Sequence, residues 1–207
     1  TLPPQPLIPA ADGSSFLTAP QALLARGQAL TKVFDNEAIA ALINDGEDHG
    51  WVSSDITEGG KYRELHAFFR ELAGVQEVSP SDLRDLLNGN LAFLPAQDDA
   101  WLIRFYTFLI DYPSLFNDLW PHRNLLTVEI IKTATEDFVA PMRQRSDASP
   151  VSDYDRYPEL AHGDYVQAVM LPPKEGMTGL DFTFVKQDLY EACPRFFEGT
   201  LGLRVPN

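Results

Sequence analysis

The sequence predicts an α+β fold made of two related units, each with a small β-sheet or hairpin and packed helices. Short apolar or alternating runs, typical of strands, lie among longer segments with apolar residues at helical spacing. The 207 residues, 44% of them apolar, are enough for one large or two small hydrophobic cores. Blocks of sequence also recur in the same order in the two halves, which indicates an internal duplication.

The predicted strands are short and lie next to turn residues. Two apolar runs flank Asp12-Gly13, a dipeptide typical of tight turns, and predict a hairpin over 7–18. The other predicted strands are 51–53, 128–131, 137–140, 165–171 and 180–185. Their lengths favour small mixed or antiparallel sheets.

The predicted helices carry apolar residues at helical spacing and end at Gly, Pro or Asn. The most regular covers 98–112, where Asp98 or Asp99 caps an aromatic stripe that we interpret as core packing. A second helix carries one apolar stripe from Leu65 to Leu72 and ends at Gly74. The remaining predicted helical segments are 20–25, 37–44, 79–89, 114–120 and 189–199.

Three blocks make up the repeat. Residues 8–20 align with 131–141, since both have a strand, a polar turn, a Phe with an aliphatic residue, and then Ala-Pro. Trp51-Val52 aligns with Phe184-Val185. A Phe-Phe pair lies six residues before a Gly in both halves, Phe68 before Gly74 and Phe196 before Gly202, at an offset of 128 residues. We therefore expect one unit over 1–88, a helical connector over 89–123 and a second, truncated unit over 124–207.

The charge balance is acidic, with 16 Lys and Arg against 30 Asp and Glu and a net charge of −14. Such a chain is repelled by nucleic-acid phosphates and by anionic membranes, so we expect neither as a partner. The densest basic pair, Arg143 and Arg145, lies at the start of a long polar loop over 142–160 and is followed at once by acidic residues. The acidic residues fall mostly in loops and helix caps.

The single cysteine, Cys193, excludes an internal disulfide, which fits a reducing, cytoplasmic compartment. We interpret it as a small apolar residue on a helix face. No signal peptide and no apolar run of membrane-spanning length is present in the sequence. The opening residues, Thr1-Leu2-Pro3-Pro4, are typical of the middle of a protein, so we expect the chain to be a piece of a longer one.

Several of these segments resemble the region downstream of the ATPase domain in sacsin-like proteins. They are Pro6–Gly13, Phe68–Val75, Asp98–Leu109 and Phe196–Pro206. The resemblance implies a large cytosolic parent with an ATPase of the GHKL type, and a chaperone-like or defence-associated role. It implies nothing about catalysis in this stretch, and neither the Asp-x-Gly-x-Gly turn nor the Gly-rich lid of that ATPase is present in the sequence. No functional residue is carried over.

The chemistry-bearing motifs are weak. His162-Gly163-Asp164 has the spacing of an iron facial triad, but no second histidine follows it. The acidic loop 44–50 lacks the ligand spacing of a calcium hand. The paired carboxylates occupy turns or helix starts, where they stabilise the backbone; they are Asp98-Asp99, Glu136-Asp137 and Asp153 with Asp155. We assign no catalytic, cofactor-binding or metal-binding residue.

Three functions remain open. The first is a non-catalytic structural or protein-interaction module of a sacsin-like protein, which would bind a protein partner and the rest of its parent chain. The second is an enzyme with a metal or carboxylate site around His162 and Asp164. The third is a stand-alone acidic binding protein that mimics nucleic acid.

Overall fold

The computed structural model describes residues 7–56, 60–116, 124–144, 161–162, 165–173 and 182–205. The chain divides into two units, unit 1 over Thr1–Phe93 and unit 2 over Leu94–Asn207. Both contain helices and small sheets, so the expected α+β class is confirmed. The division places residues 94–123, most of the expected connector, in unit 2.

Unit 1 begins with the expected hairpin. Strands β1 (Ile8–Pro9) and β2 (Phe16–Leu17) pair antiparallel. The carboxylate of Asp12 accepts hydrogen bonds from the backbone N–H groups of Ser14 and Ser15, which closes the turn. The hairpin is therefore built by local interactions that the sequence encodes within a dozen residues.

A three-stranded parallel sheet forms the centre of unit 1. Strand β3 (Ala22–Ala25) lies between β4 (Gly50–Trp51) and β5 (Gln76–Val78). The expectation of a helical turn over 20–25 was wrong, and so was that of only mixed or antiparallel sheets. All four residues of β3 are buried, and a strand buried on both faces has a continuous apolar run that does not alternate.

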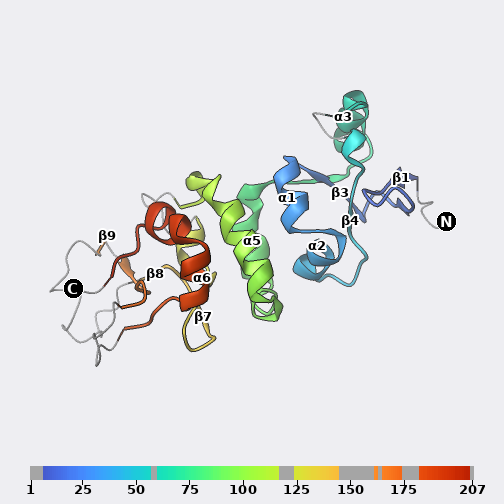
Figure 1. Cartoon of the computed structure of the whole chain (residues 1–207). Coiled ribbons are helices and arrows are strands. Elements are labelled where there is room, and N and C mark those ends of the chain that lie inside the picture. Colours follow the sequence, from blue (N-terminus) through green and yellow to red (C-terminus); the bar gives the residue numbers. More distant parts are fainter. Residues whose placement is uncertain are drawn as a thin grey trace. The chain divides into compact units, whose positions relative to one another are not determined.

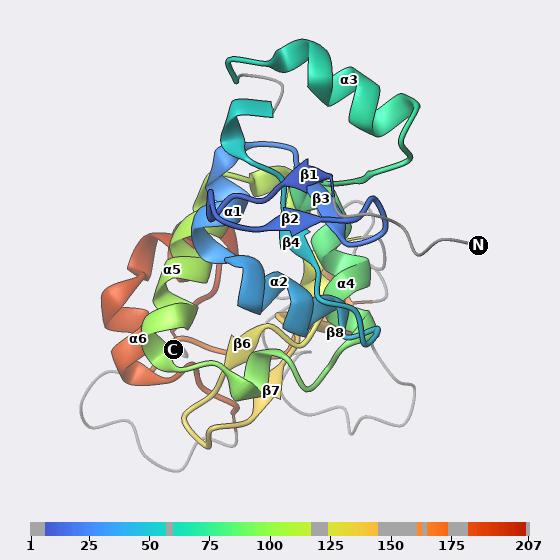
Figure 2. The ribbon, with the colours of Figure 1, turned by 90° about the vertical axis from the view of Figure 1, so that its right-hand side faces the viewer.

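The helices of unit 1 lie on both sides of this sheet (Figures 1 and 2). Helix α2 (Asn36–Ile43) is capped by Asp35 and lies on one side; α3 (Arg63–Glu71) lies on the other. On the α3 side, Phe69 and Ala73 pack on a buried apolar cluster that includes Leu24. The remaining helices are α1 (Gln28–Val33) and α4 (Leu83–Gly89), with 3₁₀ turns at Ser54–Ile56 and Pro80–Asp82.

Unit 2 is organised around helix α5 (Asp99–Ile110), which Asp98 caps as expected. Six of its side chains are buried, which confirms that its aromatic stripe is core. Helix α6 (Gln187–Ala192) and a π-helix (Arg195–Thr200) pack against α5, and Pro194 separates the two. Short 3₁₀ turns lie at Leu94–Ala96, Pro113–Phe116 and Leu125–Thr127.

The strands of unit 2 form a hairpin and a small antiparallel sheet. The hairpin pairs β6 (Ile131–Lys132) with β7 (Phe138–Val139). The sheet has the order β8-β10-β9, in which the strands are Met142–Gln144, Tyr165–Gln167 and Ala161–His162. Of the expected segments, residues 145–160, 117–120 and 180–181 lie outside the described part of the chain.

The same set of backbone hydrogen bonds occurs within each of the two units. In each, the first hairpin strand continues into an antiparallel bridge to the aromatic-Val segment, Ala10 to Val52 in unit 1 and Thr133 to Val185 in unit 2. Three further hydrogen bonds recur, with N···O distances of 2.8 to 3.1 Å. The matching pairs, donor first, are Ala11–Trp51 and Ala134–Phe184, Ser53–Pro9 and Lys186–Lys132, and Val52–Leu23 and Val185–Met170.

The Phe-Phe helices end in the same way. The N–H of Val75 donates to the carbonyl of Phe69, and the N–H of Leu203 donates to that of Phe197, both at 2.9 Å. Each turn depends on a glycine with positive φ, 69° at Gly74 and 65° at Gly202. The blocks that recur in the sequence thus form equivalent structures.

The two glycines give a first prediction. We expect Gly74→Ala and Gly202→Ala each to destabilise the protein by about 1 kcal/mol, because an L side chain is strained at positive φ. No atom lies within 4 Å of the added Cβ at either position, so the cost is in the backbone alone. Chemical denaturation followed by circular dichroism measures the change.

Two other glycines are matched controls. Gly89 and Gly199 also have open space for a Cβ, but neither has a positive φ. Their alanine variants should be neutral or slightly stabilising. Equal destabilisation by all four substitutions would contradict the shared turn.

Candidate functional site

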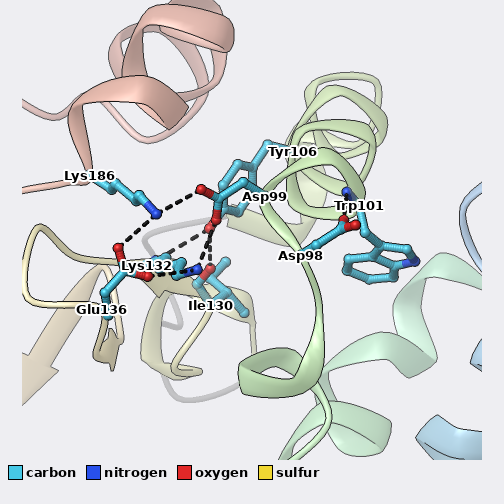
Figure 3. Close-up of polar contacts among 8 residues, drawn as sticks. All are labelled: Asp98, Asp99, Trp101, Tyr106, Ile130, Lys132, Glu136 and Lys186. Atoms are coloured by element: carbon cyan, nitrogen blue, oxygen red, sulfur yellow. Dashed lines mark hydrogen bonds and ion pairs between the residues drawn. The ribbon is translucent and has the colours of Figure 1, made fainter.

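Four charged side chains of unit 2 form an alternating ring, shown in Figure 3 and named here the ionic cluster: Asp99, Lys132, Glu136 and Lys186. Lys186 Nζ lies 2.7 Å from one oxygen of Asp99 and 2.7 Å from one of Glu136. Lys132 Nζ lies 2.8 Å and 2.9 Å from the remaining oxygens of the same two carboxylates. Each carboxylate therefore lies between two ammonium groups.

The backbone brings these residues together. The hydrogen bond from Lys186 N to Lys132 O, at 3.1 Å, places the two lysines side by side. Glu136 lies in the hairpin turn with a φ of 67°, and Asp99 lies in the first turn of α5. Two adjacent cations repel each other unless anions lie between them, so the carboxylates are the natural partners of this strand pairing.

The ionic cluster keeps all four groups charged. Hydrogen bonds from Lys132 and Lys186 lower the pKa of Asp99, and hydrogen bonds from Lys186 and Lys132 lower that of Glu136. The same carboxylates raise the pKa of both lysines, with Asp99 the larger cause in each case. Each carboxylate oxygen of the ring contacts an ammonium group, so the cluster ties α5 to the hairpin.

Tyr106 lies beside this cluster and is fully buried. Its hydroxyl donates to the carbonyl of Ile130 at 2.8 Å and accepts from the N–H of Lys132 at 3.3 Å. Burial raises its pKa above the ordinary range of a tyrosine. The phenol thus stays protonated and supports the hairpin.

Cys193 is buried, and its Sγ lies 3.7 Å from the carbonyl oxygen of Ile103 on α5. Burial raises the pKa of the thiol. A nucleophilic cysteine needs the opposite shift, toward thiolate. Its environment agrees with the interpretation of Cys193 as a small apolar residue.

The histidines of unit 1 are each paired with one carboxylate. His49 Nε2 contacts both oxygens of Asp45, at 3.0 and 2.9 Å, within the acidic loop 44–50. His66 Nε2 lies 3.5 Å from an oxygen of Glu77. The hydrogen bond to His49 lowers the pKa of Asp45. Within the described ranges, no three His, Cys, Asp or Glu side chains are grouped to hold a metal ion.

The expected alternative site is only partly visible. His162 ends strand β9, which pairs with β10, but its side chain and the whole of Asp164 lie outside the described residues. Asp153, Asp155 and Arg145 also lie outside them. Arg143 lies on β8 with its side chain exposed.

Helix α3 carries an exposed apolar surface, which we call the α3 face: Leu65, Phe68 and Leu72. These residues are 41%, 48% and 78% exposed. The sequence predicted this stripe as one face of a helix, and such a face is ordinarily buried. Here the side of α3 that faces the core carries Phe69 and the buried His66, so Leu65, Phe68 and Leu72 face solvent.

Comparison with known proteins found no match: no family model, no curated protein and no solved structure matches the chain. Across the part of the chain that the structure describes, every helix is too short or too polar to cross a membrane.

The ionic cluster gives a second prediction. We expect Asp99→Asn to lower the free energy of unfolding at pH 7 by about 1 kcal/mol, because both lysines then depend on Glu136 alone. The lowered pKa of Asp99 makes its contribution present above 3.8, its ordinary value, and lost as the pH falls through the folded value. The wild-type protein should therefore lose more stability between pH 6 and pH 3 than the variant. Urea denaturation at both pH values measures this.

Glu129→Gln is the control, because it removes the same charge from an exposed side chain of unit 2. Its pH dependence should match that of the wild-type protein. A variant at Asp99 with unchanged pH dependence would show that the cluster contributes nothing measurable.

Proposed function

We propose that this chain is a non-catalytic protein-interaction module of a larger, cytoplasmic, sacsin-like chaperone or defence-associated ATPase. The resemblance described above supports the proposed family. The proposal that the chain binds another protein depends on one observation, the α3 face. The sequence motifs that could carry chemistry do not favour a reaction over this role.

The α3 face supports binding because exposed apolar surface is costly in water. Each Å² of it that a partner covers contributes about 25 cal/mol. Leu65, Phe68 and Leu72 lie three and four residues apart, so they share one side of the helix. Grouped apolar side chains of this kind mark interaction sites more often than single exposed residues do.

The polar groups of unit 2 also support this proposal, because their charges and protons are already held by partners within the unit. The ionic cluster satisfies its own charges, and burial keeps the tyrosine and the cysteine protonated. The net charge of −14 disfavours nucleic acid and anionic lipid as partners of the α3 face. A protein surface with apolar side chains is the class of partner that remains.

Photocrosslinking tests this proposal. We expect benzoylphenylalanine at position 68, in the full-length chain in its native cells, to crosslink to a polypeptide, either a separate protein or another segment of the parent. The same amino acid at Leu91, which is 61% exposed but not on α3, is the matched control. Mass spectrometry identifies what is attached. Crosslinks to nucleic acid or lipid, or equal labelling from both positions, would contradict the proposal.

The sequence around residues 1–207 in the parent gene tests the family assignment separately. A GHKL-type ATPase domain encoded upstream would support a sacsin-like parent. A different domain in that place would remove the family but leave the proposed protein binding intact.

A further inference from the structure

The Phe-Phe helix has the same face exposed in unit 1 and buried in unit 2. The shared offset of 128 residues pairs Leu65 with Cys193 and Phe68 with Phe196. Leu65 and Phe68 are 41% and 48% exposed, whereas Cys193 and Phe196 are 4% and 0% exposed. Both helices end in the same glycine turn, although in unit 2 Cys193 and Pro194 separate α6 from the π-helix that carries Phe196.

The hairpin shows the same difference one residue before its first strand. Ile8 and Ile131 open the equivalent strands β1 and β6, and both are buried. The preceding residue is Leu7 in unit 1, which is 73% exposed, and Ile130 in unit 2, which is 0% exposed. A third apolar position is thus uncovered in unit 1 alone.

Helix α5 contacts all three buried counterparts in unit 2. The ring of Tyr106 stacks on that of Phe196, with centroids 5.0 Å apart and planes 7° from parallel. Its hydroxyl donates to the carbonyl of Ile130. Cys193 contacts the backbone of α5 at Ile103. The helix ahead of the hairpin is therefore the element that covers this face.

Unit 1 has no such helix among its described residues. In unit 2, α5 precedes the hairpin in chain order and has 12 residues. The residues directly before Leu7, in the place that α5 has before the hairpin of unit 2, lie outside the described part of the chain.

Resting on the proposed role in protein binding, the geometry points to one occupant of the α3 face: an amphipathic helix of the α5 type, supplied by a protein partner. An aromatic ring at the position of Tyr106 would stack on Phe68, as Tyr106 stacks on Phe196. An apolar residue one turn before it would cover Leu65. This mode of binding is the packing of two helices through their apolar sides.

The contact differs from that of α5 in its electrostatics. Lys132 and Lys186, which bind Asp99, correspond to Pro9 and Ser53 in unit 1, and neither of these carries a charge. The occupant therefore gains nothing from an acidic residue at the position of Asp99. Raising the salt concentration from 50 to 500 mM should therefore not weaken the binding of an acidic helix to this acidic chain, because salt screens the repulsion between like charges.

A peptide with the sequence of residues 97–112 is the probe, labelled with a fluorophore and stapled on the side opposite Tyr106 so that it stays helical. We expect saturable binding to the 207-residue protein by fluorescence anisotropy. Phe68→Asp and Leu65→Asp should each weaken binding by at least about tenfold. Both side chains are substantially exposed, so the variants should fold, which circular dichroism verifies.

Two controls accompany this titration. Leu91→Asp changes an equally exposed apolar residue away from α3 and should leave the affinity unchanged. A peptide with Tyr106→Asp should bind at least about tenfold more weakly, because a charge replaces the ring. Together they assign the binding to the α3 face and to the aromatic position of the helix.

Several results would overturn the inference. Binding that is unaffected by Phe68→Asp would place the peptide elsewhere, for instance on unit 2. Self-association in sedimentation experiments that Phe68→Asp abolishes would make a second copy the occupant, and competition by anionic vesicles would make it lipid. A peptide that fails while position 68 still crosslinks to a protein would reject the helix and retain the proposed function. Failure of both experiments would reject both.

Discussion

Each unit depends on the backbone hydrogen bonds between its hairpin and its aromatic-Val segment, which is Trp51-Val52 in unit 1 and Phe184-Val185 in unit 2. A hairpin with two residues in each strand is not stable by itself, so it must be held by neighbours. In both units, backbone hydrogen bonds to the aromatic-Val segment do this, for example from Ala11 to Trp51 and from Ala134 to Phe184. The pairing requires no particular side chain, which allowed the rest of each unit to differ. In unit 1 the aromatic-Val segment also pairs with strand β3 of the parallel sheet. In unit 2 helix α5 supports the hairpin, through the hydrogen bonds of Tyr106 to Ile130 and Lys132.

Local features of the fold could be predicted from the sequence. The hairpin over 7–18 and the caps Asp35 and Asp98 depend on residues within one or two turns of each other, so their signals are complete in a short window. Strand β3 (Ala22–Ala25) could not be identified in this way. Its four apolar residues fit a buried strand or a helical turn equally well, and only pairing with two distant strands decides between them.

The candidate site was harder to predict for the same reason. The ionic cluster joins α5, the second hairpin and the residue before α6, and a single sequence does not show that these segments meet. The stripe from Leu65 to Leu72 was predicted correctly as one side of a helix. Its exposure was not, because helical spacing shows which residues share a side but not what covers them. Alignment of the two halves was the signal that could have raised the question, since it pairs Leu65 and Phe68 with residues that follow the aromatic helix 98–112 in the chain.

The ionic cluster also limits how the second unit can change during evolution. Replacing one of its lysines leaves two carboxylates against a single cation, and replacing one carboxylate leaves two cations against a single anion. Substitutions at these four positions should therefore occur together in homologous chains, with all charges present or all absent. Pro9 and Ser53, which occupy the equivalent places of the two lysines, carry no such mutual dependence and are free to vary one at a time.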